Sequence, residues 1–261
     1  VMIGGFAGMV NETFDRIALR HLSSCPQETA DCNNWIMGQI GIYGACYKLS
    51  IIMSLFIQAF KFAAEPFFFS KMNRSDAKQT YATVLNVYTL FLLTVFLGVV
   101  AYMDILQYFV GKQYRIGLNI VPILLMANLC LGVYYNLSIW YKVSDKTIYG
   151  AYISIIGAVI TLVMNCLLVP KFGYIGAAWT TLLCYVSIML LCYFIGQKYY
   201  PVNYPIKRLM LYTFFALLLF GLMQLTVVNI GITMRLIVNT LLLLIFIITA
   251  YYFDIRKLLK S

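Results

Sequence analysis

The sequence predicts an all-α integral membrane protein, a polytopic helical bundle of about eight transmembrane helices. Of the 261 residues, 62% are hydrophobic and only 11% are charged, whereas soluble domains are roughly 45–50% apolar and 25% charged. The apolar residues also gather in runs of about 20, the length that a helix needs to cross a bilayer. Such a chain has no room for a soluble catalytic domain.

Seven apolar segments have the length of a membrane-spanning helix. They are Gly38–Phe62, Thr80–Met103, Leu118–Tyr141, Thr147–Val169, Gly173–Gly196, Ile206–Val228 and Ile232–Phe253. An eighth segment, Ile3–Leu22, begins apolar and then carries Asn11, Glu12, Asp15, Arg16 and Arg20. Charged side chains persist inside a membrane where they face protein or water, so this face is expected to point into the bundle.

The basic residues predict the topology, because cytoplasmic loops are enriched in Lys and Arg. One set of alternate loops, with the C-terminal tail, holds eleven of them: Lys71, Arg74, Lys78, Lys142, Lys146, Lys198, Lys207, Arg208, Arg256, Lys257 and Lys260. The other set holds four: Lys112, Arg115, Lys171 and Arg235. This split predicts that both ends are cytoplasmic and that Ile3–Leu22 spans the membrane. It also accounts for the net charge of +10 without a nucleic-acid partner.

Two connecting segments are more than turns. DILQYFVGKQYRI, Asp104–Ile116, mixes aromatic and charged residues and predicts a short helix at the outer interface. KYYPVNYP, Lys198–Pro205, contains two prolines and predicts a cytoplasmic linker. The expected domains are therefore a lobe over residues 1–197, the linker over 198–205, and two additional helices with a basic tail over 206–261.

The polar residues of the first segment fall on one helix face. Glu12, Arg16 and Arg20 are four residues apart, with Asp15 beside them and Asn11 one turn away. Two interpretations stand: an ion pair that joins two helices, or a polar wall of a substrate pathway.

The second segment carries a continuous polar stripe, with its members three or four residues apart. The stripe comprises Tyr47, Ser50, Ser54, Gln58, Lys61 and Glu65, and Lys48 lies slightly off it. Such a stripe is typical of a helix that lines a hydrated cavity. Lys61 can pair with Glu65 across one turn, or it can extend to the lipid headgroups.

Enzymatic and metal-binding signatures are missing from the sequence. His21 is the only histidine, there is no glycine-rich phosphate loop, and the seven cysteines lack metal or redox spacing. No catalytic residue, metal or cofactor is predicted. Cys25 and Cys32 share a polar loop, where they form either a disulfide or two free thiols.

Four stretches carry a family resemblance: GGFAGMVNETFDRIALRHL, IGIYGACYKLSIIMSLFIQAFKFAAEPFFFS, VPILLMANLCLGVYYNLSIWYKVSDKT and LLVPKFGYIGAAWTTLLCY. They resemble the C-terminal part of bacterial polysaccharide biosynthesis flippases of the multidrug/oligosaccharidyl-lipid/polysaccharide exporter superfamily. The resemblance implies the second six-helix lobe of a two-lobed fold, followed by two extra helices. The start of the sequence lacks an initiator methionine and a signal peptide, and we expect a longer protein that supplies the first lobe.

The resemblance further implies translocation of undecaprenyl-diphosphate-linked oligosaccharides, such as O-antigen or capsule repeat units, across the bacterial cytoplasmic membrane by alternating access. Polysaccharide polymerase and chain-length proteins are the implied partners, besides the lipid bilayer. The candidate substrate-binding residues are Asn11, Arg16, Lys48, Ser54, Gln58 and Lys61. Glu12, Asp15 and Glu65 are candidate coupling or gating carboxylates, with the coupling ion open between proton and sodium.

Three other functions stay open from the sequence. A cation-coupled multidrug exporter of the same superfamily predicts a cavity in which acidic residues outnumber basic ones, whereas here the two are balanced. A membrane polysaccharide polymerase or acyltransferase predicts a large outer loop with catalytic residues, but the longest outer loop, Ser23–Met37, offers only Glu28 and Asp31. A structural scaffold is the third.

Overall fold

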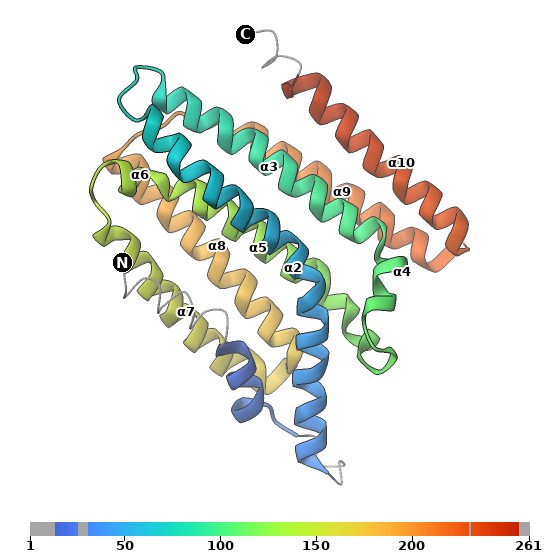
Figure 1. The fold of residues 1–261 in the computed structure, drawn as a ribbon. Coiled ribbons are helices and arrows are strands. Elements are labelled where there is room, and N and C mark those ends of the chain that lie inside the picture. Colours follow the sequence, from blue (N-terminus) through green and yellow to red (C-terminus); the bar gives the residue numbers. More distant parts are fainter. Residues whose placement is uncertain (1–13, 26–30, 230, 256–261) are drawn as a thin grey trace. The chain divides into compact units, whose positions relative to one another are not determined.

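The computed structural model describes residues 14–25, 31–229 and 231–255, and every regular element in these ranges is helical (Figure 1). The long helices are α2 (Cys32–Lys71), α3 (Ala77–Ala101), α5 (Val121–Leu137), α7 (Ile148–Phe172), α8 (Tyr174–Tyr199), α9 (Ile206–Asn229) and α10 (Ile232–Ala250). The short elements are residues 14–22, α4 (Met103–Leu106), η1 (Gln107–Phe109), η2 (Lys112–Ile120), α6 (Ile139–Val143) and the π-helix η3 (Tyr251–Ile255). The predicted all-α polytopic membrane bundle is confirmed.

Seven helical stretches within the described residues are long and apolar enough to cross a membrane. They match the seven apolar segments of the sequence one to one, with η2, α5 and α6 forming a single stretch from Lys112 to Val143. Of the eighth predicted span, residues 14–22 are helical and the preceding part lies outside the described residues. The chain is thus a multi-pass membrane protein.

Helix α2 is much longer than the apolar segment that predicts it. It has 40 residues and continues through Pro66 to Lys71, which gives a length of about 60 Å, twice the hydrocarbon thickness of a bilayer. In Figure 1, α2 changes direction partway along its length. Near its midpoint Ser50 Oγ donates to the Tyr47 carbonyl at 2.8 Å, a back-bond that bends helices.

The segment predicted as a short interfacial helix is helical but divided into short pieces. α4 and η1 cover Met103–Phe109, and η2 begins at Lys112 after a break at Val110 and Gly111. Glycine is required at position 117 of η2, since a Cβ there would lie 2.2 Å from Ile42 Cγ2 of α2.

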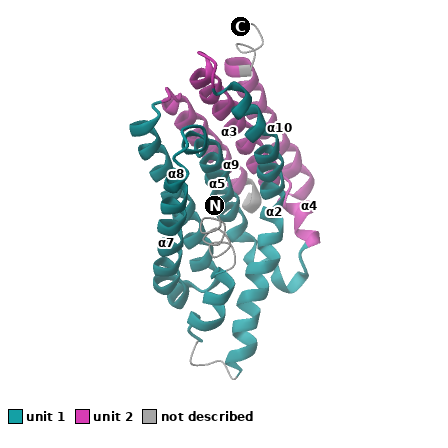
Figure 2. Cartoon of the chain, turned by 60° about the vertical axis from the view of Figure 1, so that its left-hand side comes forward, with its two compact units in different colours: residues 1–72, 110–201 teal, residues 73–109, 202–261 magenta. Residues whose placement is uncertain are grey.

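The helices form two compact units (Figure 2). The first unit comprises residues 1–72 and 110–201, with α8 packed against both α5 and α7. The α7–α8 packing depends on Gly176, where a Cβ would lie 2.5 Å from the Leu168 carbonyl oxygen. Only a glycine permits two helix backbones to approach so closely.

The second unit comprises residues 73–109 and 202–261 and packs α3 against α9 and α10. Two polar clusters stabilise it. The Arg235 guanidinium, in the first turn of α10, pairs with Asp104 of α4. Beyond the last turn of α10, buried Asp254 accepts hydrogen bonds from Arg208 at 2.6 Å, from Asn86 at 3.2 Å and from Tyr212. The second unit therefore contains α3 together with the two C-terminal helices.

Candidate functional site

Among the described residues of the first unit, Asp15 is the most deeply buried carboxylate, with 2% of its surface exposed. Three side chains from three helices donate hydrogen bonds to it. Tyr43 Oη of α2 and Thr181 Oγ1 of α8 each lie 2.7 Å from Oδ2, and Asn165 Nδ2 of α7 lies 2.9 Å from Oδ1. We refer to Asp15, Tyr43, Asn165 and Thr181 as the Asp15 site.

The local sequence explains how these donors reach one carboxylate. The run GYIGAAWTT at the start of α8 places small residues where α8 meets α7. The contact at Gly176 and Leu168 lies about one turn from Asn165 on α7 and about one and a half turns from Thr181 on α8. Close approach at the glycine therefore brings Asn165 and Thr181 together on the side that faces Asp15.

The three donors to Asp15 among the described residues are all uncharged. No Lys or Arg of the described ranges forms an ion pair with it, and its neighbour Arg16 is exposed, with Cζ 5.8 Å from the centroid of the Tyr47 ring. Burying a carboxylate that forms no ion pair is costly in a membrane. Hydrogen bonds from three donors offset part of that cost.

The Asp15 site accommodates either protonation state of the carboxyl group. Thr181 Oγ1 lies 2.7 Å from Asp15 Oδ2 and 3.0 Å from the Ala177 carbonyl. An ionised Asp15 accepts the Thr181 hydrogen. A protonated Asp15 can donate to Thr181 Oγ1, whose own hydrogen then goes to the Ala177 carbonyl.

The oxygen atoms of the site also fit a hard cation, which prefers carboxylate, hydroxyl and amide oxygens. The Asp15 carboxylate and Thr181 Oγ1 supply two such groups. Asn165 Oδ1 is buried and has no hydrogen-bond partner among the described residues, so its oxygen is available as well. No group of three or more His, Cys, Asp or Glu side chains in the described ranges fits a metal ion.

Three members of the polar stripe of α2 contact α5 or α6 at successive levels along the helix. Ser54 Oγ donates to Asn128 Oδ1 at 3.3 Å, Lys61 Nζ lies 4.7 Å from the centroid of the Tyr135 ring, and Glu65 pairs with Lys142. The three partners are seven residues apart, so they lie on one face of the α5–α6 stretch. These three contacts, Ser54–Asn128, Lys61–Tyr135 and Glu65–Lys142, form a seam between α2 and the α5–α6 stretch.

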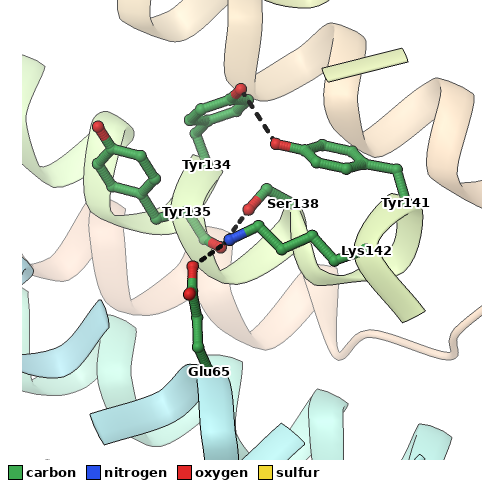
Figure 3. A network of polar contacts seen from close by, with 6 residues as sticks. All are labelled: Glu65, Tyr134, Tyr135, Ser138, Tyr141 and Lys142. Atoms are coloured by element: carbon green, nitrogen blue, oxygen red, sulfur yellow. Dashed lines mark hydrogen bonds and ion pairs between the residues drawn. The ribbon is translucent and has the colours of Figure 1, made fainter. Parts of the chain in front are cut away.

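Figure 3 shows the end of the seam, where the Glu65 carboxylate meets the Lys142 ammonium. The helix around Lys142 is held by Ser138 Oγ, which donates to the Tyr135 carbonyl at 2.7 Å, and by the Tyr134 and Tyr141 hydroxyls, 3.5 Å apart. Glu65 thus pairs with Lys142 on a different helix. Of the two alternatives left open for Lys61, the pair with Glu65 across one turn does not form.

The predicted site residues differ in their surroundings. Asn11 and Glu12 lie outside the described residues. Arg16, Lys48 and Gln58 are exposed, Ser54, Lys61 and Glu65 are half-buried, and Asp15 is buried. The structure brings Ser54, Lys61 and Glu65 onto the seam and places Asp15 in a separate site.

Sequence reasoning missed several partners of these residues: Tyr43, Asn128, Tyr135, Lys142 and Thr181. Tyr43 lies four residues before Tyr47 and extends the polar stripe by one turn, a signal that was available. Thr181 gives no such signal, because a threonine in an apolar helix commonly donates to its own backbone.

In comparisons with known proteins, no family model, curated protein or solved structure matches the chain.

Proposed function

We propose that the chain is the second lobe of a bacterial transporter, and not an enzyme, that translocates polyprenyl-diphosphate-linked oligosaccharides across the cytoplasmic membrane. The observation that carries this proposal is the Asp15 site. Burying a carboxylate in a membrane with only neutral hydrogen-bond donors costs free energy of folding. A scaffold protein gains little from it, whereas a transporter uses it to sense an ion.

The protonation geometry supports ion coupling. The hydrogen of Thr181 has two acceptors within reach, Asp15 Oδ2 and the Ala177 carbonyl. Proton uptake by Asp15 then exchanges hydrogen bonds without leaving a buried group unpaired. A sodium ion on the same oxygens is the alternative, with Asn165 Oδ1 as a further ligand. Either ion changes the charge between α2, α7 and α8 and can thereby favour one arrangement of the lobe over another.

The basic residues support an anionic substrate. Arg16 and Lys48 are exposed, and no carboxylate of the described ranges forms an ion pair with either. Lys61 contacts the Tyr135 ring instead of a carboxylate, so its charge is also uncompensated. Each of these cations is suited to contact a phosphate group, Arg16 in a bidentate manner and either lysine as a point charge. Lys48 and Lys61 are 13 residues apart on α2, a rise of about 20 Å, so the two lysines would contact the substrate at different depths.

The test is export of surface polysaccharide by cells that carry the full-length protein with Arg16→Ala or Lys61→Ala. Each substitution removes a charged contact, for which we expect about a tenfold or greater loss of export at equal protein level. Lys171→Ala, which changes an exposed lysine at the end of α7, is the matched control and should leave export normal. Normal export by both Arg16→Ala and Lys61→Ala would refute the substrate assignment.

A cation-coupled drug exporter is a second candidate, favoured by one observation: the buried acidic group Asp15 forms no ion pair with a Lys or Arg of the described residues. This candidate predicts that the full-length protein expels a small organic cation such as ethidium and that Asp15→Asn abolishes the efflux. The oligosaccharide proposal predicts no ethidium efflux from either protein.

A further inference from the structure

Aromatic side chains gather where three membrane-spanning stretches of the first unit end or begin. Trp140 precedes the end of α6 at Val143, Tyr149 opens α7, and Tyr199 closes α8. The Tyr199 ring lies 4.9 Å from the Tyr149 ring and 6.1 Å from the Trp140 ring, nearly parallel to the latter. Because the three stretches are candidate spans, their shared end lies at the depth of the lipid headgroups.

Two ammonium groups share the Tyr199 ring. Lys146 Nζ lies 4.2 Å from its centroid and Lys198 Nζ lies 5.8 Å from it. No carboxylate of the described residues forms an ion pair with either lysine, whereas nearby Lys142 is neutralised by Glu65. The ring holds both cations in place by cation–π attraction, but their charge is not compensated.

The surroundings favour a lipid over a soluble anion. Ile148 and Tyr152, on the first turns of α7, are exposed and continue from the lysines along the apolar surface of the span. An acyl chain can lie against them while its headgroup meets the lysines. A free phosphate gains nothing from this apolar surface.

We propose that Lys146, Lys198 and Tyr199 form a binding site for the phosphate group of an anionic phospholipid. The two ammonium groups bind the phosphate oxygens, and the aromatic cluster fixes their spacing. Asp145 is the one carboxylate in the turn before α7. It is exposed and has a positive φ of 52°, and its negative charge weakens the site. The proposal is independent of the transported substrate.

The test measures binding of phosphatidylglycerol to the full-length protein, delipidated and returned to phosphatidylcholine nanodiscs, by native mass spectrometry. Lys146→Gln/Lys198→Gln should weaken phosphatidylglycerol binding about thirty-fold, or about fivefold for each lysine. Lys112→Gln/Lys171→Gln is the control, because it removes the same charge from two exposed lysines of the same unit that form no ion pair with a described carboxylate. This control should bind normally.

A third variant tests the site in the opposite direction. Asp145→Asn removes the nearby negative charge, and asparagine tolerates the positive φ, so binding should strengthen by about fivefold. Equal losses in the two double-lysine variants, or unchanged binding in Lys146→Gln/Lys198→Gln, would overturn the proposal. So would competition by millimolar inorganic phosphate that displaces the lipid, because the site would then be one for a soluble anion. Equal thermal stability of all variants in phosphatidylcholine verifies that they are folded.

Discussion

Asn165 Nδ2 donates to Asp15 Oδ1 at 2.9 Å, while Oδ1 of the same asparagine is buried without a partner among the described residues. The amide is thus oriented by the carboxylate alone. An asparagine that only joins helices would use both of its polar atoms. Asn165 is better understood as a support for Asp15, with an oxygen left available beside it.

Replacing Asn165 with leucine should destabilise the protein by about 1.5–3 kcal/mol, the range for a hydrogen bond to a charged group. The substitution removes one of three donors from a buried carboxylate. Thermal unfolding of the full-length protein in detergent measures the effect. Asn136→Leu is the control: both polar atoms of Asn136 are buried without partners in the described part of the chain, so leucine should be neutral or stabilising there. Equal destabilisation by the two substitutions would contradict the role of Asn165.

The Glu65–Lys142 pair predicts a specific coupling between α2 and α6. A double-mutant cycle with Glu65→Gln and Lys142→Met should give a coupling energy of about 0.5–1 kcal/mol, since both side chains are partly exposed and solvent weakens the pair. The same cycle with Glu65→Gln and Lys61→Met should give no coupling. A larger coupling to Lys61 than to Lys142 would show that the helical neighbour, one turn away, is the true partner.

Asp254 should be the main polar contribution to the stability of the second unit. Asp254→Ala removes the acceptor for Arg208, Tyr212 and Asn86 and should cost about 1.5–3 kcal/mol in unfolding experiments. Arg208 is half-exposed, so its guanidinium can be hydrated once Asp254 is removed. The unpaired charge therefore adds little to the loss of stability. The control is Asp76→Ala, which changes an exposed carboxylate that makes no side-chain cap at the start of α3. If Asp76→Ala lowers the free energy of unfolding as much as Asp254→Ala does, the hydrogen bonds of Asp254 make no specific contribution to stability.

The positions of the seven apolar spans were predictable, because a run of about 20 apolar residues has few alternatives in a membrane. The length of α2 was not predictable from its apolar residues. It runs past Phe62 to Lys71, and in this extension Glu65 pairs with Lys142 on α6. The polar stripe indicated a helix as far as Glu65, but a partner on another helix leaves no trace in the local pattern. The polar stripe of α2 could be predicted, because periodicity shows which residues share one face of a helix. Periodicity does not show which neighbouring helix that face contacts, so the contact with α5 and α6 could not be predicted.

The sequence predicted Asp15 as a functional residue but did not predict the side chains that donate hydrogen bonds to it. A carboxylate in an apolar segment marks a position of interest, and Asp15 was identified in this way. Its donors lie 28, 150 and 166 residues away. Tyr43 could be assigned to the polar stripe, but one sequence contains no information on which residues meet across such separations. The contacts of Tyr43 and Thr181 with Asp15 therefore emerged only with the packing of α2 and α8.

The most direct test of ion-coupled translocation is a reconstitution of the full-length protein in liposomes with a fluorescent polyprenyl-diphosphate oligosaccharide, whose arrival in the opposite leaflet is measured with and without a proton or sodium gradient. The wild-type protein should translocate faster under one of the two gradients. Asp15→Asn, which keeps the shape of the protonated acid, should translocate at a rate that neither gradient changes. A gradient response of wild-type size in Asp15→Asn, or no translocation by the wild-type protein under any gradient, would contradict the account.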